Sequence, residues 1–315
     1  MQLKSFSFKT KDGFEHWVNR WIPDSNVQVK AIIQLHHGIA EHSLRYDRFG
    51  SILADEGFVL NGYDMRGHGK TGELAEANGS GIKGKIANKN GDKIVVQDLY
   101  EMIEDVKKEY PNVPVIIFSH SFGTFVAQGF LQKYSDLVDG AILSGTAGPE
   151  RAKLFFSKFA VCFIKLFSGN NKNVKLLDKI AFGTFNKDFE SEGKNAWISS
   201  DNLSVQMHDM DTWCDVSLKA SFYKDLTTLL NKIYKKSNMK KIKKDLPILI
   251  SYGTKDPVGQ YGKTVEKLIG EYKTLGLKNL SVLKYENVRH ELLNEVNKEQ
   301  VEKDFIEWIR QVLPS

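Results

Sequence analysis

The sequence is poor in cysteine and has no long apolar run. Its 315 residues include two cysteines, Cys162 and Cys214, which form no C-x-x-C pair and stand at no zinc-type spacing from histidine. No stretch approaches the ~18 apolar residues of a membrane-spanning helix, and no apolar signal segment follows Met1. The sequence therefore predicts a cytoplasmic protein that needs neither a disulfide framework nor a metal ion.

The chain also carries little net charge. The 44 Lys and Arg residues exceed the 39 Asp and Glu residues by only +5, which permits attraction to an anionic membrane without requiring it. This small excess does not indicate a nucleic-acid partner, and the chain has no internal repeat or low-complexity tract. The length is sufficient for one large hydrophobic core with a smaller inserted unit, and it leaves the oligomeric state open.

Strand-like and helix-like segments alternate along most of the chain. A hairpin is predicted around the Asp-Gly pair at 12–13, and buried strands are predicted at 30–38, 58–64, 114–119, 139–145, 246–253 and 280–287. Helical spacing predicts helices at 44–57, 91–111, 122–134, 263–275 and 298–312. Between 66 and 91 we expect a loop, with Asp92 capping the helix that follows.

This alternation is typical of an α/β protein with a mostly parallel sheet and helices on both faces. Residues 149 to 240 differ, because they carry helical spacing and no clear strand. We therefore predict a core of residues 1–147 and 241–315, with a helical cap at 148–240 inserted between two strands.

The segment PVIIFSHSFGTFVAQGF, residues 114–130, places Ser121 between a predicted strand and a predicted helix. On a sharp turn of this kind the serine backbone is strained and the hydroxyl points outward, and the residues two positions to either side must be small. Gly123 meets this need, whereas Ser119 stands where a glycine is usual. From the turn alone, a nucleophilic serine and a serine that caps the following helix are both open.

Two later strand ends carry partners for a nucleophilic serine. Asp256 follows the predicted strand 246–253, and His290 follows the predicted strand 280–287. Because the carboxyl ends of parallel strands meet at one edge of a sheet, we expect both side chains to lie beside Ser121. Taken singly, Asp256 reads as a turn former and His290 as a helix cap. Together, residues of these types in the chain order Ser, Asp, His predict a catalytic triad.

Catalysis by such a triad also needs two backbone N–H groups that stabilise the oxyanion of the reaction. One is expected from Phe122, directly after Ser121, and the other from the turn after the strand at 30–38. Gly38 lets the chain turn, and we expect the N–H groups of Ile39 and Phe122 to face the site together. The nearby histidines lack the spacing and the carboxylates of a zinc site, and we interpret them as hydrogen-bonding residues that fix the loop: His36, His37 and His42.

Several short segments match the motifs of a known family. HGIAEHSLRY, DMRGHGKT, SHSFG, DPV and HEL stand at residues 37–46, 64–71, 119–123, 256–258 and 290–292. They resemble H-G-x-x-E-H-S-x-R-Y, D-x-R-G-H-G-x-S, G-H-S-x-G, D-P-V and H-E-L of the monoacylglycerol lipase and lysophospholipase group, which has the α/β-hydrolase fold. The departures are Thr71 and Ser119, and the resemblance covers residues 1–147 and 245–315.

The resemblance implies a cofactor-free serine ester hydrolase that acts on monoacylglycerols, lysophospholipids or small carboxylic esters. It implies Ser121, Asp256 and His290 as catalytic residues and a structural role for Asp64 and Arg66, which brace loops beside the site. An aminopeptidase of the proline iminopeptidase type remains open, since acidic residues able to hold an α-amine lie in the cap: Glu190, Glu192, Asp209, Asp211 and Asp215. A non-catalytic binding protein of the same fold also remains open, supported only by the departure at position 119. A dehalogenase is disfavoured, because its nucleophile is an aspartate.

The most apolar part of the predicted cap is the segment 151–167. At ~100° per residue its apolar side chains fall on one arc: Phe155, Phe156, Phe159, Phe163, Leu166 and Phe167. Basic side chains fall on another arc: Arg151, Lys158 and Lys165. A lid helix whose phenyl face lines an acyl-chain tunnel or transiently contacts a membrane surface fits this pattern, and so does a cap helix packed on the core. Both can hold, since a cap face packed over the site can also line a tunnel. The lysine-rich stretch 235–245 fits either attraction to anionic lipid or a solvated hinge.

Overall fold

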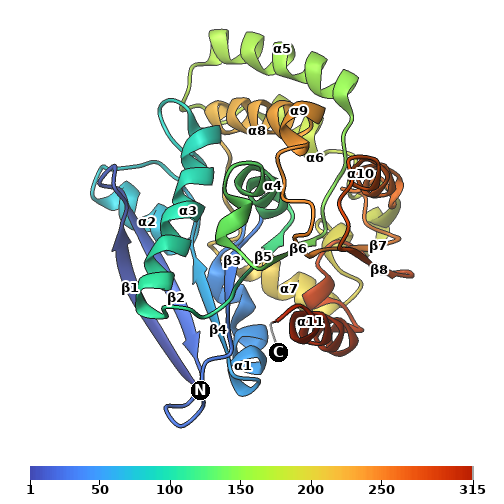
Figure 1. Cartoon of the computed structure of the whole chain (residues 1–315). Coiled ribbons are helices and arrows are strands. Elements are labelled where there is room, and N and C mark those ends of the chain that lie inside the picture. The colour runs from blue at the N-terminus through green and yellow to red at the C-terminus, as the bar shows by residue number, and fades with distance from the viewer. Residues whose placement is uncertain (314–315) are drawn as a thin grey trace.

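An eight-stranded sheet crosses the molecule (Figure 1). The computed structural model describes residues 1–313, and within helix α5 it describes only the backbone of residues 153, 158, 159, 162, 163 and 165–168. The strand order is β1-β2-β4-β3-β5-β6-β7-β8. The strands are β1 (Gln2–Lys9), β2 (Glu15–Ile22), β3 (Ala31–His36), β4 (Phe58–Tyr63), β5 (Val115–His120), β6 (Gly140–Ser144), β7 (Ile248–Gly253) and β8 (Leu280–Tyr285).

The first two strands form the predicted hairpin, and the sheet is otherwise parallel. β2 runs antiparallel to both β1 and β4, whereas β4, β3, β5, β6, β7 and β8 are parallel to one another. Every residue of β3, β4, β5, β6 and β7 is buried, as the continuous apolar runs of these strands predict for a sheet covered on both faces. The predicted α/β class with a mostly parallel sheet is therefore confirmed.

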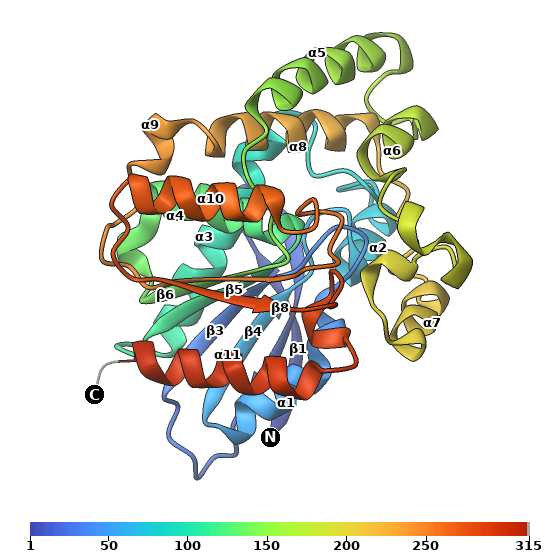
Figure 2. The same cartoon turned by 90° about the vertical axis from the view of Figure 1, so that its right-hand side faces the viewer.

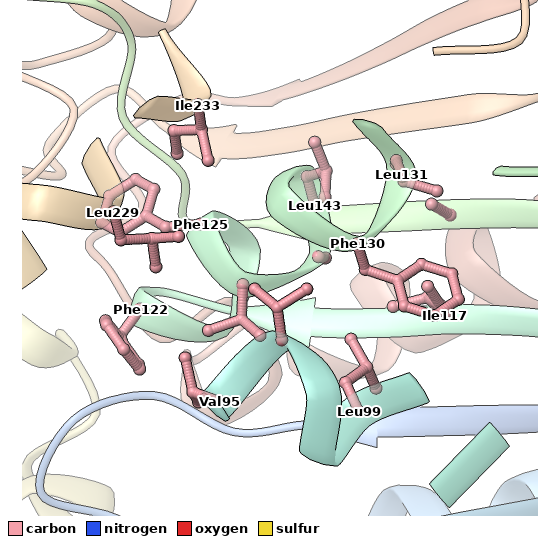
Figure 3. Packing of buried hydrophobic residues seen from close by; sticks show 14 of the residues in the cluster. Val95, Leu99, Ile117, Phe122, Phe125, Phe130, Leu131, Leu143, Leu229 and Ile233 are labelled. Carbon is pink, nitrogen blue, oxygen red and sulfur yellow. The ribbon is translucent and has the colours of Figure 1, made fainter. Parts of the chain in front are cut away.

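Helices cover the sheet on both faces (Figure 2). One face carries α1 (Asp47–Asp55) and α11 (Lys298–Val312), packed around Trp21, Phe49 and Phe305. The other face carries α3 (Gly91–Glu109), α4 (Phe122–Tyr134) and α10 (Lys263–Thr274). Helix α8 (Ala220–Ile233) packs on α3 and α4, on their side away from the sheet. Figure 3 shows Val95 and Leu99 of α3 packed beside the phenyl rings of α4 and the strand β5. Burial of these apolar side chains is the main force that holds α4, and with it Ser121, on the sheet.

The chain between β6 and β7 is helical, as predicted. Its helices are α5 (Arg151–Ser168), α6 (Lys175–Phe182), α7 (Asn202–Met210), α8 and α9 (Lys236–Met239). The division into a core and a cap at residues 148–240 stays a prediction. Within that segment, α8 packs on α3 and α4, on their side away from the sheet. Short 3-10 turns complete the chain: Ser43–Tyr46, Ser135–Leu137, Lys187–Glu192, Ala196–Ile198 and Leu292–Asn294.

The predicted loop between 66 and 91 is wrong in its first part, which forms helix α2 (Gly69–Ala77). The helix carries little apolar periodicity, so its sequence does not mark it. Tertiary contacts hold it instead: the Asp64 carboxylate accepts the N–H of Lys70 at 2.7 Å, and the Thr71 hydroxyl accepts the N–H of Trp17 at 2.7 Å. The predicted cap of α3 is also wrong, because Asn90 occupies that position and Asp92 lies in the first turn.

Candidate active site

Ser121 joins the end of β5 to the start of α4. Its backbone has φ 51° and ψ −120°, a left-handed conformation that costs a non-glycine residue about 1–3 kcal/mol. Two hydrogen bonds hold the backbone of Ser121 in this conformation. Its N–H donates to the Ser144 carbonyl at 3.0 Å, and its carbonyl accepts the N–H of Thr124 at 2.9 Å. The Ser121 side chain makes no cap hydrogen bond to α4, so the helix-capping interpretation is not supported.

Gly123 lies where α4 passes closest to β3. A Cβ at this position would stand 2.1 Å from the carbonyl oxygen of His36 and 2.8 Å from that of His37. Both contacts are with backbone, which cannot rotate away as a side chain can. The close approach of helix and strand, and therefore the sharpness of the turn at Ser121, requires glycine here.

We expect Gly123→Ala to destabilise the protein by about 3 kcal/mol, because the added methyl forces α4 away from β3. Thermal and urea unfolding measure this change. The control is Gly270→Ala, since a Cβ at this position in α10 meets nothing within 4 Å and alanine favours the helix. Equal unfolding midpoints for the two variants would contradict the close approach.

Ser119, the departure from the usual glycine, is accommodated at the end of β5. It is fully buried, and its hydroxyl donates to the carbonyl oxygen of Ile142 on β6 at 2.8 Å. The extra side chain therefore has a hydrogen-bond partner and leaves the turn at Ser121 in place.

Asp256 and His290 come together as the sequence predicts. Nδ1 of His290 lies 2.9 Å from Oδ2 of Asp256, and the two residues are only 2% and 1% exposed. The other carboxylate oxygen of Asp256 accepts the N–H of Val258 at 2.8 Å. Since a carboxylate only accepts hydrogen bonds, the proton of the neutral imidazole lies on Nδ1, and Nε2 has a free lone pair.

The surroundings of His290 favour its charged form. Burial alone would lower the pKa of this imidazole, but the Asp256 carboxylate and its hydrogen bond, with smaller contributions from Glu291 and Glu41, raise the pKa above its ordinary value. Nε2 is buried, and no atom of the described residues hydrogen-bonds to it. His290 is thus oriented at one nitrogen and unpartnered at the other, the arrangement that a general base needs.

His120 connects this pair to Ser121. The rings of His120 and His290 lie 4.7 Å apart, and Ser121 is the next residue along the chain. Trp197 also lies against His290, with ring centroids 5.2 Å apart. The structure therefore brings the three predicted residues to one edge of the sheet, and within the described chain it records no hydrogen bond between Ser121 and His290.

The loop after β3 touches the turn at Ser121. A Cβ on Gly38 would stand 3.0 Å from the Cβ of Ser121, so this loop and the turn are in contact. The N–H of Gly38 is already used, because it donates to the Glu41 carboxylate. Ile39 follows it, and Phe122 is the first residue of α4. The N–H groups of Ile39 and Phe122 stay predicted as the oxyanion donors.

A buried ion cluster that the sequence did not indicate ties this loop to the loop of His290. The guanidinium of Arg45 donates to both carboxylate oxygens of Glu291 at 2.7 Å and to Glu41 at 3.1 Å. Burial would raise the pKa of Glu291, but the Arg45 charge holds that pKa well below its usual value. Because Glu41 holds Gly38 and Glu291 follows His290, Arg45 fixes both sides of the site relative to each other. The adjacent cavity of about 10 Å³ has room for one water molecule.

The histidines of the loop act largely as predicted. Nε2 of His37 accepts the N–H of Met65 at 2.9 Å, and its Nδ1 lies 2.8 Å from the Gly38 carbonyl oxygen. Burial lowers the pKa of His36 and of His37 to about 3, so both rings are neutral. His37 therefore fixes the loop as a hydrogen-bonding residue.

His42 instead reaches the chain between β6 and β7. Its Nε2 lies 2.7 Å from the Asp211 carboxylate, and Cys214 completes a group whose donor atoms lie within 4.8 Å of one another. Burial raises the pKa of the Cys214 thiol, which disfavours the thiolate that a metal ion would need. The pairing of His42 with Asp211 links residues that are remote in the sequence.

Asp64 and Arg66 brace loops, as predicted. Asp64 accepts the N–H and the hydroxyl of Ser43 at 2.8 and 2.6 Å, which positions the start of the 3-10 turn that follows His42. Arg66 makes a two-bond pair with the buried Asp98 of α3 at 2.8 Å. Neither side chain contacts Ser121, Asp256 or His290 by a hydrogen bond within the described chain.

Known proteins resemble this chain in sequence and in fold. A monoacylglycerol lipase of Mycolicibacterium smegmatis is 26% identical over 134 residues, which are 40% of this chain and 41% of that protein. The match therefore spans less than half of the relative's length. A carboxyl esterase from Bacillus coagulans, solved in complex with glycerol, is 26% identical with a TM-score of 0.85, and all of both chains is covered. A lipase solved in its open form is 22% identical with a TM-score of 0.88, again over both whole chains.

A sequence model of one family matches most of the chain. It covers residues 27–297, from before β3 to the start of α11, and its description is serine aminopeptidase, S33. With the strand order and the two covered faces described above, these matches establish the α/β-hydrolase fold. The chain belongs to the Hydrolase_4 family of α/β-hydrolases.

Proposed function

We propose that this protein is a serine hydrolase of carboxylic esters, with Ser121 as nucleophile, His290 as general base and Asp256 as the residue that orients it. One observation carries the proposal: His290 is held by Asp256 at Nδ1, while its buried Nε2 has no partner within the described chain, next to the strained turn of Ser121. The names of relatives support the reaction class, since they include monoacylglycerol lipases and a carboxyl esterase.

In the first half of the reaction Ser121 Oγ attacks the ester carbonyl carbon, and His290 Nε2 takes the hydroxyl proton. The carbonyl oxygen becomes an oxyanion, which the N–H groups of Ile39 and Phe122 stabilise as hydrogen-bond donors. The C–O bond to the alcohol then breaks, and the imidazolium gives its proton to the leaving alkoxide. The products of this half are a free alcohol and an acyl group on Ser121.

In the second half a water molecule takes the place of the alcohol. His290 Nε2 accepts a water proton while the water oxygen attacks the acyl carbonyl carbon. The bond to Ser121 Oγ breaks, the serine regains a proton from His290, and a carboxylic acid leaves. Asp256 stays ionised throughout and stabilises the imidazolium in both halves.

Monoacylglycerols, lysophospholipids and small carboxylic esters are the proposed substrates. We expect turnover of p-nitrophenyl esters, and a screen by acyl length from acetate to palmitate identifies the preferred chain. A peak at medium or long chains, together with release of glycerol from a monoacylglycerol, is the expected result for a lipase. Hydrolysis of none of these esters by the folded protein would contradict the proposal.

The aminopeptidase alternative has one specific observation in its favour, the description of the family model. The cap acids that it needs are partly committed elsewhere: Glu192 pairs with Arg289 at 2.7 Å and Asp211 pairs with His42, while Glu190 and Asp215 are exposed to solvent. A carboxylate that already neutralises a cation attracts an α-amine less strongly. Parallel assays of a p-nitrophenyl ester and a prolyl p-nitroanilide separate the two activities.

Apolar side chains exposed on the helices between β6 and β7 support contact with a lipid surface. Helix α7 presents Leu203, Met207 and Met210 at 63%, 63% and 75% exposure, at the i, i+4, i+7 spacing of one face. In α5 the described Phe155 and Phe156 are exposed, and the core contact runs through Leu154, Val161 and Ile164. Arg151 of the predicted basic arc pairs with Glu271 of α10 rather than facing a lipid surface. The other members of the two arcs, which are Phe159, Phe163, Leu166, Phe167, Lys158 and Lys165, lie outside the described side chains. No helix of residues 1–313 is both long and apolar enough to span a bilayer.

We expect replacement of Leu203, Met207 and Met210 by serine to weaken sedimentation with anionic vesicles at least about tenfold, since each buried apolar side chain contributes roughly 1.5 kcal/mol. Hydrolysis of soluble p-nitrophenyl acetate stays unchanged. Val282→Ser on the exposed strand β8 is the control. Equal vesicle binding by both variants would rule out α7 as a lipid-contacting face.

A further inference from the structure

A second cavity, of about 240 Å³, is lined by residues of α3, α4, α8 and α9 and of the chain just beyond α9. It is lined by Asp92, Lys93, Val96, Gly129, Gln132, Lys133, Leu229, Lys232, Ile233, Asn238 and Lys241. Lys133 stands twelve residues after Ser121 along α4, which places the two residues about 18 Å apart at 1.5 Å per residue. The cavity is therefore separate from the proposed catalytic site.

The floor of this cavity is apolar. Val96 and Leu229 are 3% exposed and Ile233 is 1% exposed. Figure 3 shows Leu229 and Ile233 on α8, where they lie four residues apart. Gly129 keeps the space open, since a Cβ there would stand 3.0 Å from Val96 and 3.4 Å from Leu229. A ligand that fills the floor must bring an apolar part, because a polar group would find few partners there.

The rim of the cavity is cationic. Four lysines line it, against the single carboxylate of Asp92, which leaves an excess of three positive charges. Lys232 pairs with Asp92, and no other acidic side chain of the described residues forms an ion pair with Lys93, Lys133 or Lys241. Burial, together with the charges of Lys232 and Lys93, lowers the pKa of Lys133. The neighbouring amines therefore disfavour the charged form of Lys133, and a bound anion would offset this effect.

Helix geometry explains part of this cluster. Lys133 and Lys232 lie in the last turns of α4 and α8, where the helix dipole favours a cation. Lys93 does not fit this explanation, since it lies in the first turn of α3, where the dipole disfavours positive charge. The dipole also does not explain why Lys241, which lies beyond α9, lines the same cavity.

We propose that this cavity binds a phosphomonoester whose alcohol part is apolar. A phosphomonoester dianion matches the excess charge of the rim better than a single carboxylate does, and its oxygens accept the N–H groups of Lys133, Lys241 and Gln132. The alkyl part lies on Val96, Leu229 and Ile233. The volume of about 240 Å³ is about 24 times that of the one-water cavity beside Arg45, which accommodates a phosphate group with a short chain.

Isothermal titration with hexyl phosphate tests the proposal, with inorganic phosphate and hexanol as partial ligands. We expect hexyl phosphate to bind more tightly than either. The double variant Lys133→Gln, Lys241→Gln is expected to lose about tenfold or more in affinity, since hydrogen bonds to charged groups are the strong ones. The control, Lys235→Gln with Lys240→Gln, removes the same charge from exposed lysines near α9 that do not line the cavity.

Sedimentation with vesicles that contain phosphatidic acid distinguishes a soluble ester from a lipid headgroup. Hexyl phosphate binding without vesicle binding assigns the site to a soluble phosphomonoester. Vesicle binding that the lysine pair variant loses and the control keeps assigns it to the lipid. Equal affinity of both double variants for hexyl phosphate, or no binding of either probe by the unmodified protein, overturns the proposal. These measurements do not involve ester hydrolysis, so their outcome is independent of the catalytic assignment.

Discussion

Replacement of Ser121 by alanine should abolish hydrolysis of a short-chain p-nitrophenyl ester, with a fall in kcat of at least about 10⁴-fold. Without Oγ no acyl-enzyme can form, and the remaining groups can only polarise the carbonyl for a slow attack by water. The variant should unfold at the same temperature as the parent protein, because alanine tolerates the backbone at φ 51° as well as serine does and the Ser121 side chain caps no helix. Ester turnover and thermal unfolding measure the two quantities.

Ser251→Ala is the matched control for this experiment. Ser251 lies in β7, is fully buried, and its hydroxyl has no hydrogen-bond partner among the described residues. The control removes the same oxygen atom from the interior and should keep full activity. Labelling by a fluorophosphonate probe gives an independent readout, since it requires an activated serine and should be lost only at position 121. Unchanged turnover in Ser121→Ala would refute the nucleophile, and an unlabelled parent protein would favour the non-catalytic alternative.

Much of the fold was predictable because local pattern and tertiary environment agree there. The buried strands are continuous apolar runs, and the helices that cover them carry apolar residues at helical spacing, as in α3 and α11. Prediction was wrong for α2, whose nine residues are held by Asp64 and Thr71 rather than by an apolar face. A helix stabilised by remote polar contacts leaves no periodic signal in its own sequence.

The candidate site likewise has features that the sequence predicts and contacts that it does not. The common position of Ser121, Asp256 and His290 at one edge of the sheet was predictable, because the topology of a parallel sheet brings strand ends together there, whatever the intervening sequence. Their catalytic roles stay a proposal. The contact of Arg45 with Glu291 and that of His42 with Asp211 were not predictable. They depend on how loops fold over the sheet edge, and single charged residues in loops are common enough that no spacing rule pairs them. The same holds for the lysines that gather around the 240 Å³ cavity from three helices and the chain beyond α9.

Asp256→Asn should lower kcat by about 10⁴-fold while the fold stays intact. Oδ1 of Asp256 accepts the N–H of Val258, so the amide oxygen of asparagine takes this place and its NH₂ group faces His290. An NH₂ group donates, and Nδ1 must then accept, which moves the imidazole proton to Nε2. The base would be protonated at the nitrogen that must take the proton from Ser121.

The pH profile separates this orienting role from a merely structural one. Only the neutral imidazole accepts a proton, so the activity of the parent protein should fall as the pH drops through the pKa of His290, which Asp256 raises above 6.5. Without the Asp256 carboxylate, burial becomes the main influence on the pKa of His290, and burial lowers this pKa. The residual activity of Asp256→Asn should therefore persist to lower pH. The exposed Asp245→Asn is the control, with the parent rate and profile. A parent activity that does not change from pH 5 to 8 would contradict a base oriented by Asp256. So would an Asp256→Asn variant whose kcat is within about tenfold of the parent value and whose activity falls at the same acidic pH.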